Sequence, residues 1–296
     1  MIYIIVAFIT VLVLASLIYY MGSMGVVRVR ATTTTSLYAT GLLDYLSSKY
    51  IEQHPDTRID FMPVGSGEAL RRAGDGEACL VLVHAPSLEK EYIDRGVIYY
   101  HRIFAYNYFA IVGPGSDPAN VANATNIVDA MKKIYDAGEA GKAKFISRGD
   151  NSGTNIRELM LWRKAGLNPN GRKWYIVSGT GMGQTLVMAD QMNAYTLSDK
   201  GTYLKYLASN RIHNLRILYS NDTALINIYS AYLVKGCNGK ELERAKGFID
   251  FIVSSGGQEL IASYGVENYG EPLFYPADNK SSLAGIWSKL VKGLDP

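Results

Sequence analysis

Cysteine, histidine and net charge are all scarce in this 296-residue chain, and each scarcity excludes a class of function. The four histidines and two cysteines show no CxxC or HxxxH spacing, so the sequence predicts no metal centre. The net charge is only +3 and no basic tract occurs, which argues against nucleic-acid binding. Cys79 lies in an apolar run and fits a buried small hydrophobe. A disulfide between Cys79 and Cys237 stays open, because sequence alone does not establish a pair.

The N-terminal segment from Met1 to Tyr20 is almost wholly apolar and carries no charge. A run of about 20 apolar residues is long enough to cross a bilayer. No basic segment precedes it and no clear small-x-small cleavage site follows it. We therefore interpret residues 1–25 as a retained membrane anchor, with a removed signal segment as the alternative. Either interpretation predicts an extracytoplasmic protein, at the cell surface or in the periplasm.

After this segment, expected strands alternate with expected helices, which predicts βαβ units and mostly parallel sheets. The expected strands are Val26–Thr32, Ile59–Val64, Ala78–Val83, Tyr106–Val112, Phe145–Ile146, Trp174–Ser178 and Ala224–Val234. The expected helices begin or lie at Gly41–Leu46, Glu68–Ala73, Asp129–Ala137, Asn155–Lys164, Lys240–Ser254 and Gln258–Ser263.

Two of the β-rich runs, Tyr106–Val112 and Ala224–Val234, bracket the middle of the chain. We expect the chain to cross between two α/β lobes at these points. Lobe I would then contain residues 26–108 and 225–296, and lobe II residues 109–224. Proteins of this layout close two lobes on a ligand by a hinge motion, so we expect the ligand cleft between the lobes.

Three polar loops join an expected strand to an expected helix: Thr33–Ser36, Gly65–Gly67 and Ser147–Thr154. In open α/β sheets, ligands bind beyond the carboxyl ends of the strands, and helix starts favour anions. A single Ser or Thr before a helix is most often a cap, and this is the simpler interpretation of the first loop alone. The third loop holds more donors than a cap needs, because Arg148 adds a charged planar fork suited to oxyanions. Asp150 is expected to hold Arg148 or to act as a cap.

Eight motifs follow one another along the chain: Thr33–Ser36, Gly41–Asp44, Leu82–Ala85, Tyr106–Asn107, Ile111–Pro114, Ser147–Thr154, Ala194–Asp199 and Gly270–Phe274. Together they resemble the tungstate-binding proteins of ABC transporters. The resemblance covers nearly everything after the N-terminal segment, and its most specific parts are the first and third loops. Two departures are Tyr108, where an acidic residue is expected after Asn107, and the additional Thr32 before the first loop.

This resemblance implies a type II periplasmic-binding-protein fold with an oxyanion bound between the lobes. It implies a receptor that captures tungstate, or molybdate, and delivers it to an ABC transporter permease. We expect a monomer without catalytic residues, cofactor or free metal cation. The implied oxyanion-binding residues are Thr34, Thr35, Ser36, Ser66, Arg148, Ser152, Gly153 and Thr154.

Other functions remain as alternatives. A phosphate-binding receptor of the same fold is the nearest, because the loop around Arg148 also resembles that of the phosphate family. Phosphate keeps a proton near neutral pH and needs an acceptor, which Asp150 would supply, whereas tungstate, molybdate and sulfate need donors only. A hydrolase or transferase using Ser36 or Ser152 would need a base, and only His84 lies near a candidate loop, so we expect no enzyme. A sensory module with the same lobes also stays open.

Overall fold

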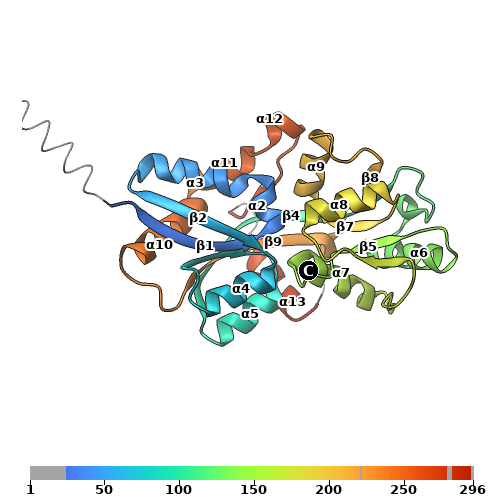
Figure 1. The fold of residues 1–296 in the computed structure, drawn as a ribbon, viewed down its shortest axis with the longest axis horizontal. Helices are drawn as coiled ribbons and strands as arrows, with labels where there is room; N and C mark the ends of the chain where they lie inside the picture. Colours follow the sequence, from blue (N-terminus) through green and yellow to red (C-terminus); the bar gives the residue numbers. More distant parts are fainter. Residues whose placement is uncertain (1–24, 221, 279–281, 295–296) are drawn as a thin grey trace, which may run out of the picture.

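The computed structural model describes residues 25–220, 222–278 and 282–294, which form two α/β lobes joined by long strands (Figure 1). The apolar run Met1–Tyr20, with the predicted membrane segment, lies outside these residues. Across the described ranges, no helix combines the length and the apolar character needed to span a membrane.

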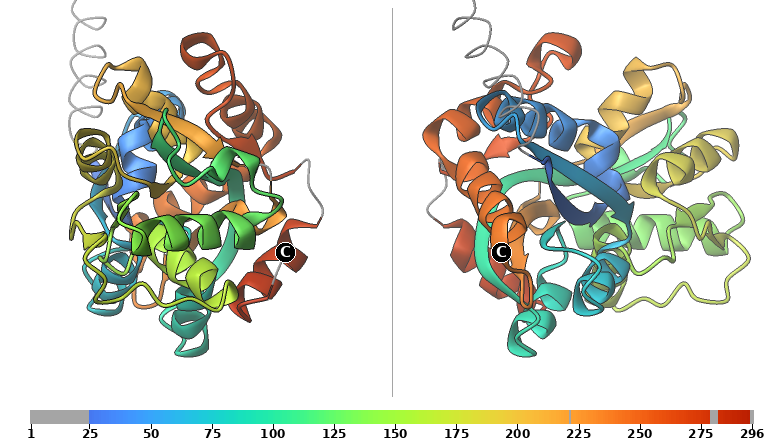
Figure 2. Two further views of the ribbon diagram at one scale, coloured as in Figure 1. Left: turned by 90° about the vertical axis from the view of Figure 1, so that its right-hand side faces the viewer. Right: turned by 60° about the vertical axis from the view of Figure 1, so that its left-hand side comes forward.

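The first lobe is built from both ends of the chain, as the blue and the orange-red segments in Figure 2 show. Its central strands run parallel, with β1 between β2 and β3. Its elements are β1 (Val27–Thr34), α2 (Thr35–Thr40), α3 (Leu42–Gln53), β2 (Thr57–Val64), α4 (Ser66–Gly74), β3 (Leu80–Val83), α5 (Pro86–Asp94), α10 (Gly239–Val253), α11 (Ser255–Ser263), α12 (Val266–Tyr269), β10 (Tyr275–Pro276) and α13 (Leu283–Val291).

The second lobe uses the middle of the chain, drawn in green and yellow in Figure 1. Its short strands β5 and β6 are parallel, whereas β7 and β8 pair antiparallel with the connecting strand β4 (Ile98–Pro114). Its other elements are η1 (Val121–Asn123), α6 (Ile127–Glu139), β5 (Phe145–Ser147), α7 (Gly153–Lys164), β6 (Tyr175–Val177), α8 (Met182–Gln191), β7 (Thr196–Asp199), α9 (Lys200–Ala208), β8 (Leu215–Tyr219) and η2 (Thr223–Leu225).

Strands β4 and β9 (Ile226–Val234) connect the lobes and make the sheet mixed rather than uniformly parallel. The first part of β4 pairs antiparallel with β9, from Ile98 to Tyr108. From Phe109 onward β4 pairs with β7 and β8 of the second lobe instead. One strand of 17 residues therefore belongs to both lobes, and the expected run Tyr106–Val112 is its interior.

Each lobe has its own apolar core. In the first lobe, Val29 and Ala31 of β1 alternate inward and pack with helices α3 and α10, where Leu46 and Phe248 are fully buried. Full burial of such a side chain contributes about 1.5–3 kcal/mol. In the second lobe, the aromatic rings of Phe145 and Trp162 lie edge to face at 5.3 Å within the core. Two separate cores allow the lobes to move as units.

Cys79 and Cys237 form a disulfide, with their Cα atoms 5.3 Å apart, which decides the question that the sequence left open. The bond lies beside the antiparallel pair of β3 and β9, where Leu80 opposes Leu233. It thereby ties the N-terminal part of the first lobe to the returning strand. Such bonds persist in oxidising compartments, which fits a protein outside the cytoplasm.

Candidate functional site

The first loop is formed where β1 passes directly into α2. Side chains alternate along the strand, so Thr32 faces α4 and donates its hydroxyl to the Ala69 carbonyl at 3.1 Å. Thr34 caps α2 by accepting from the Leu37 amide at 3.2 Å. The helix stops after one and a half turns because Gly41 takes the left-handed conformation, with φ +85°, and starts α3. The additional Thr32 thus belongs to the packing of the lobe, while Thr34 and the residues after it lie at the helix start.

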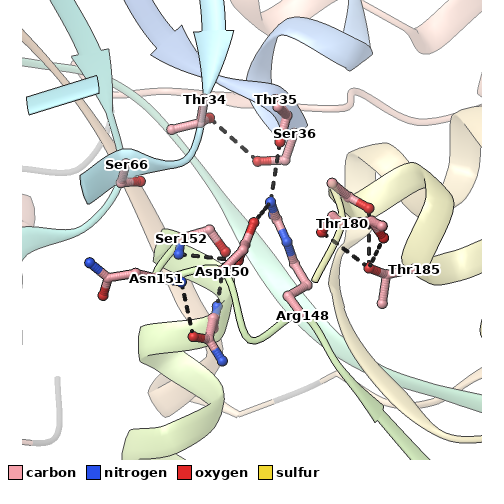
Figure 3. A network of polar contacts seen from close by, with 12 residues as sticks. Thr34, Thr35, Ser36, Ser66, Arg148, Asp150, Asn151, Ser152, Thr180 and Thr185 are labelled. Carbon is pink, nitrogen blue, oxygen red and sulfur yellow. Dashed lines mark hydrogen bonds and ion pairs between the residues drawn. The ribbon is translucent and has the colours of Figure 1, made fainter. Parts of the chain in front are cut away.

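The third loop, between β5 and α7, is shaped by two left-handed residues and a cap. Gly149 and Asn151 have φ values of +60° and +55°. Asp150 accepts from the Ser152 amide at 3.2 Å, and Ser152 caps α7 by accepting from the Asn155 amide at 3.3 Å. This turn lets Arg148 extend toward the first lobe while the start of α7 stays beside it (Figure 3).

Arg148 reaches across the junction of the lobes although its side chain is only 2% exposed. Its Nη2 atom donates to Thr35 Oγ1 at 3.2 Å and also pairs with the Asp150 carboxylate. Its Nε and Nη1 atoms are buried and have no partner among the described residues. The hydroxyl of Thr154, in the first turn of α7, is buried and unpartnered in the same way, as is that of Thr33. Buried donors without acceptors are costly, so this cluster is suited to a ligand that supplies acceptor atoms.

Burial dominates the electrostatics of this cluster. It lowers the pKa of the Arg148 guanidinium, and the negative charges of Asp150 and Asp199 work in the opposite direction. Arginine remains charged in proteins, so the site keeps a positive group. Burial also raises the pKa of the Asp199 carboxyl, whose Oδ1 caps α9 by accepting from the Thr202 amide at 2.8 Å. Its Oδ2 is buried without a partner within the described part of the chain.

The second loop brings the lobes into direct contact. Ser66, the first residue of α4, accepts from the Gly153 amide of α7 at 3.2 Å. A Cβ atom at Gly153 would lie 2.5 Å from the His84 carbonyl oxygen, and one at Gly65 would lie 3.2 Å from the carbonyl oxygen of Asp150. Gly153 is therefore needed for this close approach of the two backbones, whereas a side chain at Gly65 would require only a small shift of its neighbour.

His84 lies at the end of β3 and contacts Ser36. Its Nε2 is 3.1 Å from Ser36 Oγ, and its Nδ1 is 2.9 Å from Asn227 Oδ1 of β9. This order resembles the Ser, His and amide sequence of a nucleophilic triad. However, burial lowers the pKa of His84 to about 3, which makes the imidazole a weak base near neutral pH. Ser36 is itself fully buried, so the geometry gives a hydrolase little support.

Sequence reasoning did not assign any role to the start of α8. Figure 3 shows Thr180 and Thr185 close to Arg148. A Cβ atom at Gly181 would be 3.4 Å from Thr35 Oγ1, so this helix start also borders the first loop. Gly181 caps α8 without any side-chain hydrogen bond. The spacing of Gly179, Gly181 and Gly183 is the one signal in the sequence that marks this helix start.

The predicted site residues gather at the junction of the lobes, in contacts of different kinds. Thr35 meets Arg148 and Ser66 meets Gly153, each pair across the lobes. Thr34 and Ser36 have their hydroxyl oxygens 3.4 Å apart. Ser152 is occupied with capping α7, and Thr154 is buried in that helix without a hydroxyl partner among the described residues.

Comparisons with known proteins agree with this architecture. The model of the PBP superfamily domain matches residues 25–255. The tungstate-binding protein TupA of Peptoclostridium acidaminophilum is 42% identical over 250 residues, which are 82% of this chain and 84% of that protein. TupA of Campylobacter jejuni is 34% identical over 238 residues, covering 79% of this chain and 86% of the relative.

Solved structures show the same similarity in three dimensions. The tungstate ABC transporter protein from Geobacter sulfurreducens superposes with a TM-score of 0.71 at 36% identity, covering 80% of this chain and 98% of the other. The tungstate-binding protein TupA from Desulfovibrio alaskensis has a TM-score of 0.70 at 34% identity, covering 84% and 98%.

Proposed function

This chain belongs to the PBP superfamily and, within it, to the family of tungstate-binding proteins, and from that premise we propose that it captures tungstate outside the cytoplasm for an ABC uptake transporter. The relatives are substrate-binding proteins of transport systems, which suggests that this chain is not an enzyme. The ligand is an oxyanion and not a cofactor.

The observation that carries the proposal is the buried Arg148 with unpartnered Nε and Nη1 atoms. A cation in a dry site needs acceptors and countercharge, and among the described residues Arg148 forms one ion pair, with Asp150 through Nη2. The unpartnered hydroxyl of Thr154 adds a neutral donor. A tetrahedral dianion supplies several acceptor oxygens at once and fits this excess of donors.

The role of Asp150 favours a fully ionised oxyanion over phosphate. One of its oxygens pairs with Arg148 and the other accepts from the Ser152 amide. The carboxylate is thus engaged within the loop and is not offered as an acceptor to a protonated ligand. Phosphate carries a proton near neutral pH and needs such an acceptor, whereas tungstate and molybdate do not.

We assign the oxyanion site to both lobes, with lobe I formed by residues 26–108 and 225–296 and lobe II by residues 109–224. The first loop gives neutral donors, and the third loop gives the charged one. The assigned residues are Thr34, Thr35, Ser36 and Ser66 from lobe I and Arg148, Ser152, Gly153 and Thr154 from lobe II. The start of α8 lies beside them and offers further amide donors.

The apolar run Met1–Tyr20 would anchor the receptor at the outer face of the membrane, as a monomer that docks on its permease. The disulfide between Cys79 and Cys237 supports the extracytoplasmic side. Protease added to intact cells would digest a receptor that is exposed there. Full protection from the protease, with the protein in the cytosolic fraction, would contradict this placement.

Calorimetry with the full-length protein in detergent tests the ligand. Tungstate and molybdate are expected to bind, sulfate more weakly because it is smaller, and phosphate weakest because it needs an acceptor. A preference for phosphate would show that Asp150 turns toward the ligand and that the receptor belongs to phosphate uptake. Absence of heat with all four anions would contradict the proposed function.

A further inference from the structure

A chain of buried hydrogen bonds runs from the C-terminal segment to the oxyanion site, and its direction is fixed at one end. The Leu273 carbonyl can only accept, and the side-chain amide of Asn107 donates to it at 3.5 Å. The Asn107 side-chain oxygen then accepts from the Asn227 amide nitrogen at 3.0 Å. The Asn227 nitrogen also contacts the Tyr229 hydroxyl at 2.7 Å. The remaining Asn227 oxygen is left to face His84.

This direction determines the tautomer of His84. Its Nδ1 lies 2.9 Å from the Asn227 oxygen, which is an acceptor, so Nδ1 carries the proton. In a neutral imidazole the other nitrogen is then an acceptor. His84 Nε2 therefore accepts a hydrogen bond from the Ser36 hydroxyl at 3.1 Å. Asn107 and Asn227, on the two connecting strands, thus decide where the Ser36 hydroxyl points.

The arrangement conflicts with the binding of a fully ionised oxyanion. A serine hydroxyl can donate one hydrogen bond, and Ser36 donates it to His84. Toward a ligand it then presents only lone pairs, which repel the oxygens of tungstate. The other tautomer of His84 would place Nδ1, as an acceptor, opposite the acceptor oxygen of Asn227. Reversing both asparagine amides would place the Asn107 oxygen opposite the Leu273 carbonyl, which is also an acceptor. Neither arrangement forms a hydrogen bond. A proton added at His84 Nε2 removes the conflict, because Nε2 then donates to Ser36 and the hydroxyl is released to the ligand.

We propose that His84 takes up one proton from solvent when the oxyanion binds, and that this proton frees the Ser36 hydroxyl to donate to the ligand. The inference rests on the proposed function and deepens it by adding a proton to the bound species. The imidazolium keeps both of its hydrogen bonds, with Nδ1 donating to Asn227 and Nε2 to Ser36. It also adds a positive charge to a site in which Asp150 already offsets Arg148.

The surroundings of His84 support a proton that arrives only with the ligand. The ring is fully buried, and the rings of Phe109 and Tyr229 lie 6.3 Å and 4.9 Å from it. Burial first, and then the charges of Arg148 and Arg157, lower the pKa of His84 to about 3, while Asn227 and Asp150 act in the other direction. The imidazole is therefore neutral near neutral pH in the absence of ligand. A bound dianion, on the side of Ser36 away from His84, adds two negative charges that favour the protonated ring.

Calorimetric titration of tungstate in buffers with different ionisation enthalpies measures this proton directly. At pH 7 the wild-type protein is expected to take up close to one proton per tungstate. His84→Gln is expected to bind without uptake, because its side-chain amide donates permanently to Ser36. The matched control is His101→Gln: His101 is also largely buried and hydrogen bonds to Ser230, but it lies between the rings of Tyr232 and Trp287. This control is expected to retain the full uptake.

A second variant covers the case in which His84→Gln does not fold. Ser36→Ala removes the hydroxyl that links His84 to the ligand, so it is expected to bind more weakly and without proton uptake.

The pH dependence of affinity gives a second measure of the proton. The affinity of the wild type for tungstate should fall about tenfold for each unit by which the pH rises, as long as one proton is coupled to binding. Asp199 is another buried group beside the site that can take a proton, because its Oδ2 lacks a partner in the described ranges, and Asp199→Asn tests it.

The outcomes separate the two proposals. Absence of tungstate binding in the wild type would overturn the proposed function. Tungstate binding without proton uptake would overturn the role of His84 alone. Uptake that persists in a folded His84→Gln protein, or that disappears in Asp199→Asn, would also overturn it. Uptake that is lost in His84→Gln and Ser36→Ala but kept in His101→Gln would support it.

Discussion

The guanidinium of Arg148 in the second lobe donates to the hydroxyl of Thr35 in the first lobe across 3.2 Å. The two residues are 113 positions apart in the chain: Thr35 is the first residue of α2, and Arg148 lies in the loop that follows β5. Their contact places a buried cation and a hydroxyl-bearing loop on opposite sides of one site. We therefore predict that closure of the lobes assembles the donor set.

Replacing Arg148 is expected to weaken tungstate binding more than any loss of a single hydroxyl. A hydrogen bond to a charged group contributes about 1.5–3 kcal/mol, against about 1 kcal/mol for a neutral one. Arg148→Ala should therefore lower affinity by roughly 10- to 150-fold, and Ser36→Ala by roughly 5-fold. Arg148→Lys should recover part of the loss, because it restores the charge without the planar fork. Calorimetry with tungstate measures all three.

Thermal melts without tungstate provide the control for these variants. The two unpartnered nitrogen atoms of Arg148 offset its ion pair with Asp150, so its removal should change the melting temperature of the ligand-free protein little. If Arg148→Ala binds tungstate like the wild type and melts at a lower temperature, then Arg148 is a structural residue and the assigned site is wrong.

Gly153→Ala is expected to keep the lobes apart. The added Cβ would lie 2.5 Å from the His84 carbonyl oxygen, so one of the two backbones must shift. Such overpacking costs about 1–3 kcal/mol, which would reduce affinity by roughly 5- to 150-fold. Small-angle scattering should then show less compaction with tungstate than in the wild type. The matched control is Gly256→Ala, where nothing lies within 4 Å of the added atom.

Breaking the disulfide between Cys79 and Cys237 is expected to destabilise the first lobe. The bond closes a loop with a sequence separation of 158 residues. The chain-entropy model gives an upper value of about 5 kcal/mol for such a loop. Denaturant unfolding with and without reductant measures the loss, and a thiol assay on the unfolded, unreduced protein should detect no free cysteine. Two free thiols would contradict the pairing.

Stability without tungstate should fall as the pH is lowered, partly because of His84. Its pKa is about 3 in the folded protein, below the ordinary value of 6.5. Between these values the unfolded chain binds a proton that the folded one excludes, so stability is complete above pH 6.5 and is lost toward pH 3. From pH 7 to pH 5 the loss from this group is about 2 kcal/mol. Denaturant unfolding of His84→Gln should lack this contribution.

His101 contributes in the same direction, because burial lowers its pKa to about 4. The His84→Gln variant should therefore remove only part of the pH dependence, and His101→Gln a similar part. An unchanged pH dependence in both variants would show that the acid sensitivity comes from carboxyl groups instead.

Local patterns in the sequence were sufficient for most elements of the fold. The alternating run Val26–Thr32 and the helix signal at Gly41–Leu46 correspond to β1 and α3. The short helix α2 between them was not predicted, because six residues give too little periodicity and its end depends on the left-handed Gly41. The antiparallel pairing of β4 with β9 was also missed, since the partners of a strand depend on contacts far along the chain.

For the site, the sequence indicated the polar loops but not their mutual contacts. Ser66 and Gly153 were both predicted to bind the oxyanion, yet they bind each other across the lobes in this structure. His84 was not among the predicted binding residues, because its link to Ser36 and to Asn227 on the returning strand has no local signature. These contacts arise only when segments 48 to 143 residues apart in the chain are brought together.

The passage of β4 through both lobes limits how the receptor can open. A flexible linker would let two bodies slide or rotate freely, but a hydrogen-bonded ribbon of β4 and β9 resists stretching and shear. It yields mainly to bending and twisting, and we expect it to bend at its register shifts, between Tyr99 and Arg102 and between Ile103 and Ala105. We therefore expect opening to follow a nearly fixed path, so that the anion meets the same two faces each time and little of its binding free energy is lost in ordering the lobes.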